Sequence, residues 1–293
     1  MEFLPIGFKI MFYVLIFLYG TIIGSFLNVV ILRTPIHETI VSKRSHCMSC
    51  GYQLAWFDLV PLFSWLFLGG KCRKCKAKIS VQYPIVEAVT GVLFVLTALI
   101  KGLNVLSILD MLVISALLAL SVIDARTMEI PFGINVFIFC MGIIKVVYSI
   151  AMTVINPTVA ISAGATQEEI NLAYFGMSFL QGETLKWSDA LIGFFIVSVP
   201  LYIAFLVTKG KGMGGGDIKL MAAAGLFLGW YYIVAALIVG CLLCVIIHPI
   251  RMKFFKAEHK LAMGPYLSAG ILISIWFGYY LVYYYVKFML SLI

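Results

Sequence analysis

Two aspartates stand at the edges of long apolar runs. Asp217 follows three glycines in "GKGMGGGDIKLM" (210–221), and Asp124 ends the apolar run before "DARTMEIP" (124–131). An ionisable residue at the edge of a membrane span is by default a candidate functional residue. If these two carboxylates came together, they could not both ionise easily and would share a proton. Such a pair can activate water and protonate a scissile carbonyl, which is the chemistry of an aspartic protease.

The three glycines before Asp217 fit this chemistry. Gly214, Gly215 and Gly216 have no Cβ, so another chain can approach their backbone closely. A protease substrate lies extended across its site, and we expect these glycines to make room for it. A second interpretation remains open: Asp217 as a helix N-cap, with the glycines as an ordinary loop. The two aspartates alone favour neither interpretation.

Four cysteines have the spacing of a metal site. They form two C-x2-C pairs with 21 residues between the pairs: Cys47 and Cys50, then Cys72 and Cys75. This pattern predicts a structural zinc site, whose four protein ligands leave no open position for water. The alternative is a set of reduced free thiols. Three further cysteines lie in apolar runs, where we expect them to pack as small apolar residues: Cys140, Cys241 and Cys244.

Composition indicates a membrane protein. Of the 293 residues, 63% are hydrophobic and 12% are charged, whereas a soluble domain has about a quarter charged residues. Apolar runs of membrane-spanning length recur along the whole chain, so we predict an all-α polytopic membrane protein. About eight transmembrane helices are expected, near 9–31, 84–100, 105–123, 132–152, 190–208, 218–229, 231–249 and 264–290.

The distribution of charge predicts the orientation. The net charge is +8, and basic residues gather in residues 32–83 and 251–260. Basic loops mark the cytoplasmic side of a membrane, which accounts for the surplus, and we expect no nucleic-acid partner. This topology puts Asp124 and Asp217 at the cytoplasmic boundary. The predicted organisation is a first transmembrane helix (1–31), a small cytoplasmic zinc-binding loop domain (32–83) and a membrane core (84–293) with an outer loop at 153–189.

Other polar residues fall inside the predicted spans. Asp110 and Lys145 are expected to pair, because either charge alone in lipid is costly. Asn28 and Asn135 are expected to donate hydrogen bonds within the helix bundle.

Several motifs together resemble one enzyme family. "GGGD" (214–217) matches the GxGD motif of membrane aspartic proteases, and "DARTMEIP" matches the partner motif. "GSFLNVVILR" (24–33), "YPIVEAVTG" (83–91) and "MGPYLSAG" (263–270) match as well. In this order, over nearly the whole chain, they resemble the prepilin peptidases, also called type IV leader peptidases. Presenilin-like GxGD proteases have tyrosine before the partner aspartate, where this chain has Ile123.

The resemblance implies a specific function. Prepilin peptidases cut the short basic leader from prepilins and pseudopilins after a glycine, at the cytoplasmic face of the bacterial inner membrane, with Asp124 and Asp217 as the catalytic pair here. Members with the cysteine loop typically also methylate the new N-terminal amine with S-adenosylmethionine. By position, Gly70, Lys71 and Glu87 resemble the methyl-transfer elements.

Three alternatives remain. The chain could be a peptidase without methylation, although its cysteine loop argues against that. It could be a proton-coupled transporter that uses Asp124 and Asp217 as a relay, although no inverted repeat is evident. It could also be a non-catalytic scaffold for pilus assembly, in which neither carboxylate would be needed.

Overall fold

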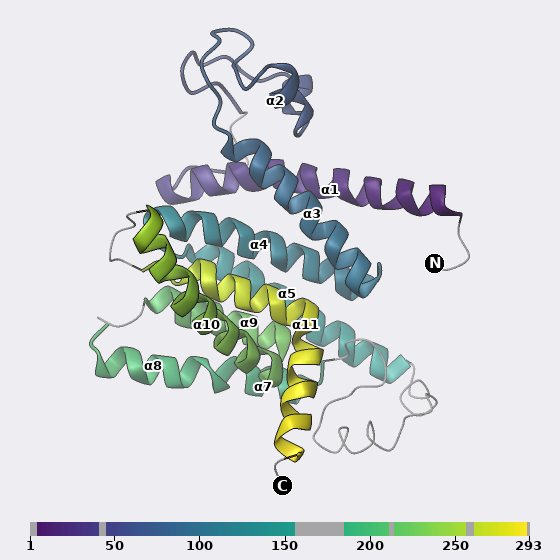
Figure 1. The fold of residues 1–293 in the computed structure, drawn as a ribbon, viewed down its shortest axis with the longest axis vertical. Helices are drawn as coiled ribbons and strands as arrows, with labels where there is room; N and C mark the ends of the chain where they lie inside the picture. Colours follow the sequence, from purple (N-terminus) through teal and green to yellow (C-terminus); the bar gives the residue numbers. More distant parts are fainter. Residues whose placement is uncertain (1–4, 41–44, 156–184, 211–213, 256–260, 292–293) are drawn as a thin grey trace. The chain divides into compact units, whose positions relative to one another are not determined.

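The structure is a computed structural model that describes residues 5–40, 45–155, 185–210, 214–255 and 261–291 (Figure 1). These residues are mostly helical and contain two isolated β-bridges but no strand. The chain divides into two compact units, Met1–Pro131 and Phe132–Ile293. Most of the predicted outer loop at 153–189 falls outside the described residues.

Seven helical segments among the described residues are long and apolar enough to cross a membrane, which confirms the all-α polytopic prediction. The expected count of eight differs because of α9 (Gly215–Leu228), which matches the predicted run 218–229. It has 14 residues, so it is about 21 Å long, against about 30 Å for the hydrocarbon core of a bilayer. It is nonetheless a separate helix, since the chain breaks at Gly229 before the next one begins.

The first unit holds the N-terminal spans and the cysteine loop. Its elements are α1 (Ile6–Arg33), η1 (Thr34–Ile36), η2 (Trp56–Leu59), α2 (Phe63–Phe67), α3 (Gln82–Lys101) and α4 (Val105–Thr127). Helices α1 and α3 approach closely because glycines face the contact: a Cβ on Gly24 would lie 2.7 Å from Glu87 Cα. At the same interface the Asn28 amide donates to the Tyr83 carbonyl at 3.1 Å, which confirms the bonding predicted for Asn28.

One end of the first unit gathers three helix ends. Asn28 near the end of α1 bonds to Tyr83 at the start of α3. Arg126 in the last turn of α4 donates to Gln82, which is also at the start of α3. The sequence segments that precede α3 and follow α4 therefore lie at the same end of this unit. The predicted topology requires this, because it puts both segments on the same side of the membrane.

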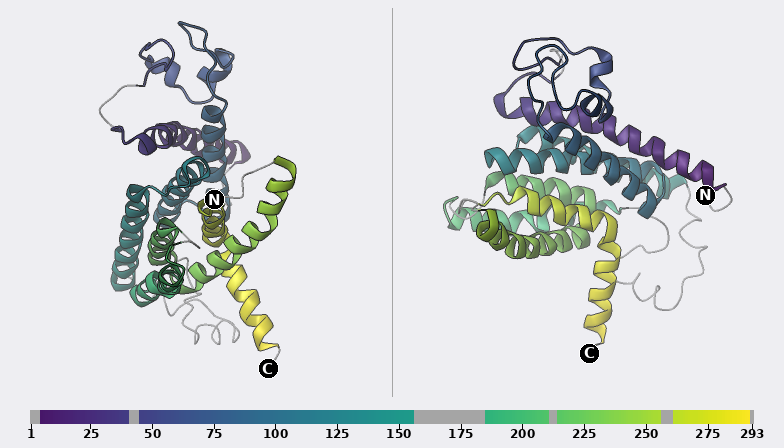
Figure 2. Two further views of the ribbon diagram at one scale, coloured as in Figure 1. Left: turned by 90° about the vertical axis from the view of Figure 1, so that its left-hand side faces the viewer. Right: turned by 45° about the horizontal axis from the view of Figure 1, so that its top comes forward.

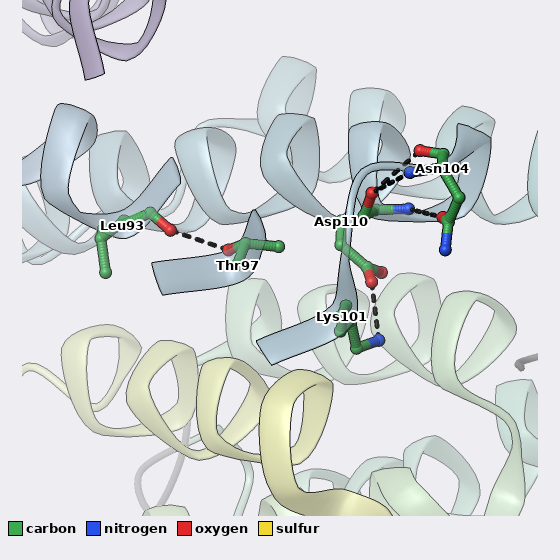
Figure 3. Close-up of polar contacts among 6 residues, drawn as sticks. Leu93, Thr97, Lys101, Asn104 and Asp110 are labelled. Atoms are coloured by element: carbon green, nitrogen blue, oxygen red, sulfur yellow. Dashed lines mark hydrogen bonds and ion pairs between the residues drawn. The ribbon is translucent and has the colours of Figure 1, made fainter. Parts of the chain in front are cut away.

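A buried ion pair connects α3 to α4 at the opposite end (Figure 3). Lys101 Nζ lies 2.7 Å from Asp110 Oδ2, and the Asp110 side chain is fully buried. The chain reverses between them through Gly102, whose φ of 72° favours glycine. Asn104 then caps α4 by accepting the Ser107 N–H at 2.7 Å. Asp110 thus has a partner, Lys101, that was not predicted from the sequence.

The predicted pairing of Asp110 with Lys145 joins residues of different units and stays a prediction. Within the second unit, Lys145 Nζ lies 4.3 Å from the centre of the Phe227 ring. The electrostatic attraction between the ammonium group and the aromatic face replaces contacts that the ammonium group would otherwise make with water.

We expect the Lys101–Asp110 pair to stabilise the first unit strongly. Asp110→Asn should lower the free energy of unfolding by about 3 kcal/mol, because breaking a buried ion pair leaves a charge poorly compensated. Lys101→Met should cost a similar amount, and the double variant should cost much less than the sum of the two. Denaturant unfolding of the purified protein in detergent measures all three. Strictly additive losses would show that the two residues are not coupled.

The second unit is built around α9. Its elements are α5 (Phe132–Ile155), α7 (Trp187–Ile196), α8 (Ser198–Val207), α9, α10 (Trp230–Phe255) and α11 (Gly264–Leu290) (Figures 1 and 2). Nearly all of α9 from Asp217 onward is buried. It packs on α7 at Gly193 and Gly225, where a Cβ on either glycine would collide with the carbonyl oxygen of the other. The predicted span 190–208 is two helices, because the chain breaks at Val197 and Pro200 lacks the N–H that would continue the ladder.

Candidate catalytic and metal sites

Asp217 lies in the first turn of α9. Gly214 holds the N-cap position, with φ −74° and ψ 138°, and no side chain caps this helix end. Asp217 is therefore the third helical residue, and the interpretation of Asp217 as the N-cap is wrong. Its side chain is buried, with 8% of the residue exposed. The positive end of the helix dipole favours a negative charge at this position.

The glycines before Asp217 differ in their surroundings. A Cβ on Gly214 would lie 3.2 Å from Asp217 Oδ2, whereas no atom of the described residues lies within 4 Å of a Cβ on Gly215. Gly216 presents its carbonyl oxygen 3.5 Å from the Asn135 amide nitrogen of α5, which confirms the bonding predicted for Asn135. Open space beside Gly215, next to a buried carboxylate, is what an extended substrate backbone would need.

Helix α5 runs parallel to α9 and begins at the same end of the second unit. Asn135 lies beside Gly216, and further along a Cβ on Gly142 would lie 3.2 Å from the Leu226 side chain. At the other end of α9, a Cβ on Gly229 would touch Leu185, just before α7. Asp217 thus lies at the end of this unit where α5 also begins, opposite the start of α7.

Asp124 lies in the last turn of α4. It is 4% exposed, and its carbonyl accepts the N–H of Met128, which ends the helix in a left-handed conformation (φ 56°). Both aspartates are therefore buried at helix ends. Because they belong to different units, their pairing stays a prediction.

The four loop cysteines come together. Their Sγ atoms all lie within 4.8 Å of one another, and the Cys47 and Cys75 sulfurs are 3.8 Å apart. A disulfide would require about 2.0 Å. Four thiolates at about 2.3 Å from a tetrahedral zinc ion would be separated by about 3.8 Å. The donor set and its spacing therefore fit zinc, and the predicted cluster is confirmed as a candidate metal site.

The two cysteine pairs have the same backbone turn. In each, the carbonyl of the first cysteine accepts the N–H four residues later, and its N–H donates to the carbonyl five residues later. The fourth residue after the first cysteine has positive φ: 68° at Gly51 and 60° at Lys76. A short antiparallel bridge closes each turn, His46 with Gln53 and Lys71 with Lys78. Each turn thus presents two thiols to a common point.

Backbone N–H groups act on the thiols directly. Those of Ser49 and Cys50 donate to Cys47 and lower the pKa of its thiol to about 6. The N–H of Ala77 lowers the pKa of Cys75, but burial and the other three thiols outweigh it and raise that pKa to about 11. Metal binding requires the thiolate, and the N–H groups of Ser49 and Cys50 favour that form at Cys47.

A salt bridge between a buried aspartate and an exposed arginine supports the cysteine loop. Arg73, inside the second cysteine pair, donates from Nε to Asp58 Oδ1 at 2.8 Å, and the Asp58 side chain is only 2% exposed. The Arg73 guanidinium also lies 4.8 Å from the centre of the Phe57 ring. This contact ties the second turn to η2. No motif in the sequence marks Asp58, so its role was not predicted.

The three predicted methyl-transfer residues surround α2. Glu87 is buried on α3, and its Oε2 accepts the Leu62 N–H at 2.8 Å, just before α2. Gly70 follows α2 with φ 66°, and the Trp65 ring of α2 would lie 2.8 Å from a Cβ there. Lys71 donates its N–H to Leu68, at the end of α2. The structure thus brings Gly70 and Glu87 to the same short helix.

Gly70→Ala should destabilise the cysteine loop, and Gly69→Ala is the matched control. Both glycines have positive φ, but a Cβ on Gly69 has no atom within 4 Å. Both variants strain the backbone by about 1 kcal/mol, and only Gly70→Ala must also displace Trp65. We expect zinc release to a chelator to be clearly faster for Gly70→Ala. Equal release rates for the two variants would contradict a packing role for Trp65.

Comparisons with known proteins confirm the resemblance to prepilin peptidases. Residues 18–100 match the bacterial peptidase A24 N-terminal domain, and residues 111–248 match the type IV leader peptidase family. The chain is 30% identical to a prepilin leader peptidase/N-methyltransferase of Aeromonas salmonicida (strain A449), over 92% of both proteins. It is 30% identical to one of Bacillus subtilis, over 93% of this chain and 97% of the relative.

A similar match spans less of a longer relative. The chain is 32% identical to a prepilin leader peptidase/N-methyltransferase of Myxococcus xanthus, over 80% of this chain and 62% of that protein. No solved structure matches the chain.

Proposed function

The chain belongs to the type IV leader peptidase family, and we propose that it is a membrane aspartic endopeptidase that also methylates its product. It would remove the basic leader of prepilins or pseudopilins after a glycine, at the cytoplasmic face of the bacterial inner membrane. The observation that carries this proposal is a pair of buried aspartates at helix ends, one of them preceded by three glycines.

Asp124 and Asp217 would share one proton in the resting enzyme. The ionised member takes a proton from water as the water oxygen attacks the scissile carbonyl, and the protonated member donates to the carbonyl oxygen. Collapse of the tetrahedral intermediate then transfers a proton to the leaving amine. Only four residues, 128–131, separate the end of α4 from the start of α5, and α5 begins beside Gly216. These facts support a common site.

The glycines would admit the substrate. Gly215, with open space beside it, is the position where the substrate backbone would approach most closely. Gly214 and Gly216 would hold the turn that leads into α9.

Zinc would be structural, held by Cys47, Cys50, Cys72 and Cys75. The metal would fix the two turns of the loop, since four thiolates leave no position for a substrate.

The segment around α2 would serve methyl transfer. S-adenosylmethionine would supply the methyl group to the new N-terminal amine. Glu87 offers a buried carboxylate that can hold the amine, and Gly70 and Lys71 shape the opposite side of α2. The support is that Glu87 and Gly70 both contact this helix.

Mass spectrometry of a prepilin-like peptide tests both activities at once. The peptide is incubated with the purified protein and S-adenosylmethionine. We expect loss of the leader and one added methyl group on the new N-terminus. Cleavage without the methyl group would leave a peptidase only and would discard the roles of Gly70, Lys71 and Glu87. Peptides that stay intact, across several prepilin leaders, would favour the proton relay or the scaffold.

The Glu87→Gln variant distinguishes a role of Glu87 in methyl transfer from a role in anchoring the loop. Glutamine keeps an oxygen that can accept the Leu62 N–H, but it carries no charge. We expect methylation to fall by about tenfold or more and cleavage to continue, because a carboxylate that holds an amine loses a charge-assisted hydrogen bond. Glu87→Ala, which also removes the tie to Leu62, is the comparison. Full methylation by Glu87→Gln would show that Glu87 only anchors the loop.

A further inference from the structure

The segment from η2 through α2, residues 56–67, has an unusual distribution of polar and apolar side chains. Seven large apolar side chains are exposed, including Trp56 (79%) and Phe67 (86%): Trp56, Phe57, Leu59, Val60, Phe63, Leu66 and Phe67. The carboxylate of Asp58 is buried instead, against Arg73. A loop surrounded by water would show the reverse arrangement, and an exposed apolar patch of this kind marks an interaction surface.

This apolar surface is held in a definite position. The Leu62 N–H is bonded to Glu87 on α3, and Trp65 packs on Gly70 and donates to the Ile79 carbonyl. Trp65 therefore faces the interior of the loop, whereas its neighbours Leu66 and Phe67 face outward. In Figure 1 and in the right-hand view of Figure 2, α2 lies on the side of the loop that is nearer to the N-terminal end of α1. That is the direction in which α1 crosses the membrane.

The charges beside this surface have one sign. Between Asp58 and Glu87 the chain has five basic residues and no acidic one. All five are exposed on the second cysteine turn: Lys71, Arg73, Lys74, Lys76 and Lys78. Cations next to exposed aromatic and leucine side chains are the combination that binds anionic lipid surfaces. A basic peptide, by contrast, would be repelled.

We propose that residues 56–67 insert into the headgroup region of the membrane that α1 and α3 cross, with the cations of residues 71–78 on anionic headgroups. The cysteine loop is then not a free appendage. It is held against the bilayer by its own aromatic side chains, in addition to its covalent connection to α1 and α3. This surface is independent of the proposed peptidase chemistry.

Quenching of tryptophan fluorescence by brominated lipids tests the insertion. The full-length protein is placed in nanodiscs of phosphatidylcholine and phosphatidylglycerol, with bromines near the headgroup end of the acyl chains. Subtracting the Trp56→Phe signal from that of the unsubstituted protein isolates Trp56, and Trp65→Phe isolates the inward-facing control. We expect quenching of Trp56 to exceed that of Trp65 by at least about twofold, since only Trp56 would touch lipid.

Further outcomes identify what covers the apolar surface of residues 56–67. Quenching of Trp56 no stronger than that of Trp65 would overturn the proposal. In that case, protection of Trp56 from aqueous acrylamide would indicate a protein partner, such as a second copy, and accessibility would indicate water. Quenching that persists undiminished in discs of phosphatidylcholine alone would overturn the role of the cations.

A double variant tests the same surface through its neighbours. Leu66→Ser with Phe67→Ser should keep the zinc content of the unsubstituted protein and lose at least half of the quenching of Trp56. Met48→Ser, at an equally exposed apolar residue on the first cysteine turn (85% exposed), should lose none. Full quenching in the double variant would show that Leu66 and Phe67 do not anchor the segment.

Discussion

Asp217→Asn should abolish leader cleavage while the protein stays folded. Asparagine has nearly the size and shape of aspartate, but it can neither take a proton from water nor give one to a carbonyl. General acid–base catalysis contributes about 10² to 10⁴ in rate, and the pair supplies both roles, so we expect a loss of at least about 10³-fold. Asp124→Asn should lose as much. The measurement is the rate of peptide cleavage by mass spectrometry.

The control for this loss is Glu129→Gln. Glu129 is an exposed carboxylate five residues after Asp124, so its substitution changes the same charge without touching a buried position. It should retain full cleavage. Zinc content and the unfolding midpoint should match the unsubstituted protein in all three variants. Cleavage above about a tenth of the normal rate in either aspartate variant would contradict the shared-proton mechanism, because each carboxylate is required for a separate proton transfer.

Cys75→Ser should release zinc, unfold the cysteine loop and abolish methylation. Binding of a structural zinc ion supplies about 10–16 kcal/mol in small zinc-finger peptides. Apart from the contacts of Asp58, Leu62 and Trp65, the described residues of the loop form only a short α2 and two isolated bridges, so we expect the metal to supply most of its stability. We expect about one zinc ion per chain in the unsubstituted protein, by elemental mass spectrometry, and a large loss in the variant. Cleavage should continue, because both aspartates lie outside the loop.

Cys140→Ser is the matched control for the zinc prediction. Cys140 lies on α5, outside the cluster, and is exposed, so the substitution should leave both zinc and methylation unchanged. Full zinc in Cys75→Ser would show that the cluster is not the metal site. Loss of cleavage together with methylation would show that the loop also supports the peptidase.

The features that the sequence predicted well are those determined by a length or a spacing. Apolar runs identified the spans because bilayer thickness sets their length. The C-x2-C spacing identified the cysteine cluster because two residues between thiols form one tight turn. Asp217 was correctly placed at a helix start, but its role as N-cap was wrong. Three glycines precede it, and side-chain propensity does not indicate which of them holds the N-cap position.

The interaction partners of the buried carboxylates could not be predicted in the same way. Asp110 was expected to pair with Lys145, yet its first-unit partner is Lys101, nine residues away across a turn that depends on the left-handed φ of Gly102. Glu87 meets the backbone N–H of Leu62, which has no sequence signature at all. The exposure of Phe63 and Phe67 on α2 has no sequence signature either and is seen only in the structure.

By itself, therefore, the sequence determined the all-α membrane class, the candidate aspartates and the candidate metal-binding cysteines, because hydropathy and residue spacing act along the chain. Tertiary structure alone decided that α9 is a short buried helix, since its glycine contact with α7 and its packing beside α5 come from distant segments. It also decided how Asp58, Leu62 and Trp65 hold the cysteine loop. These contacts depend on distances through space, which local patterns in the chain do not encode.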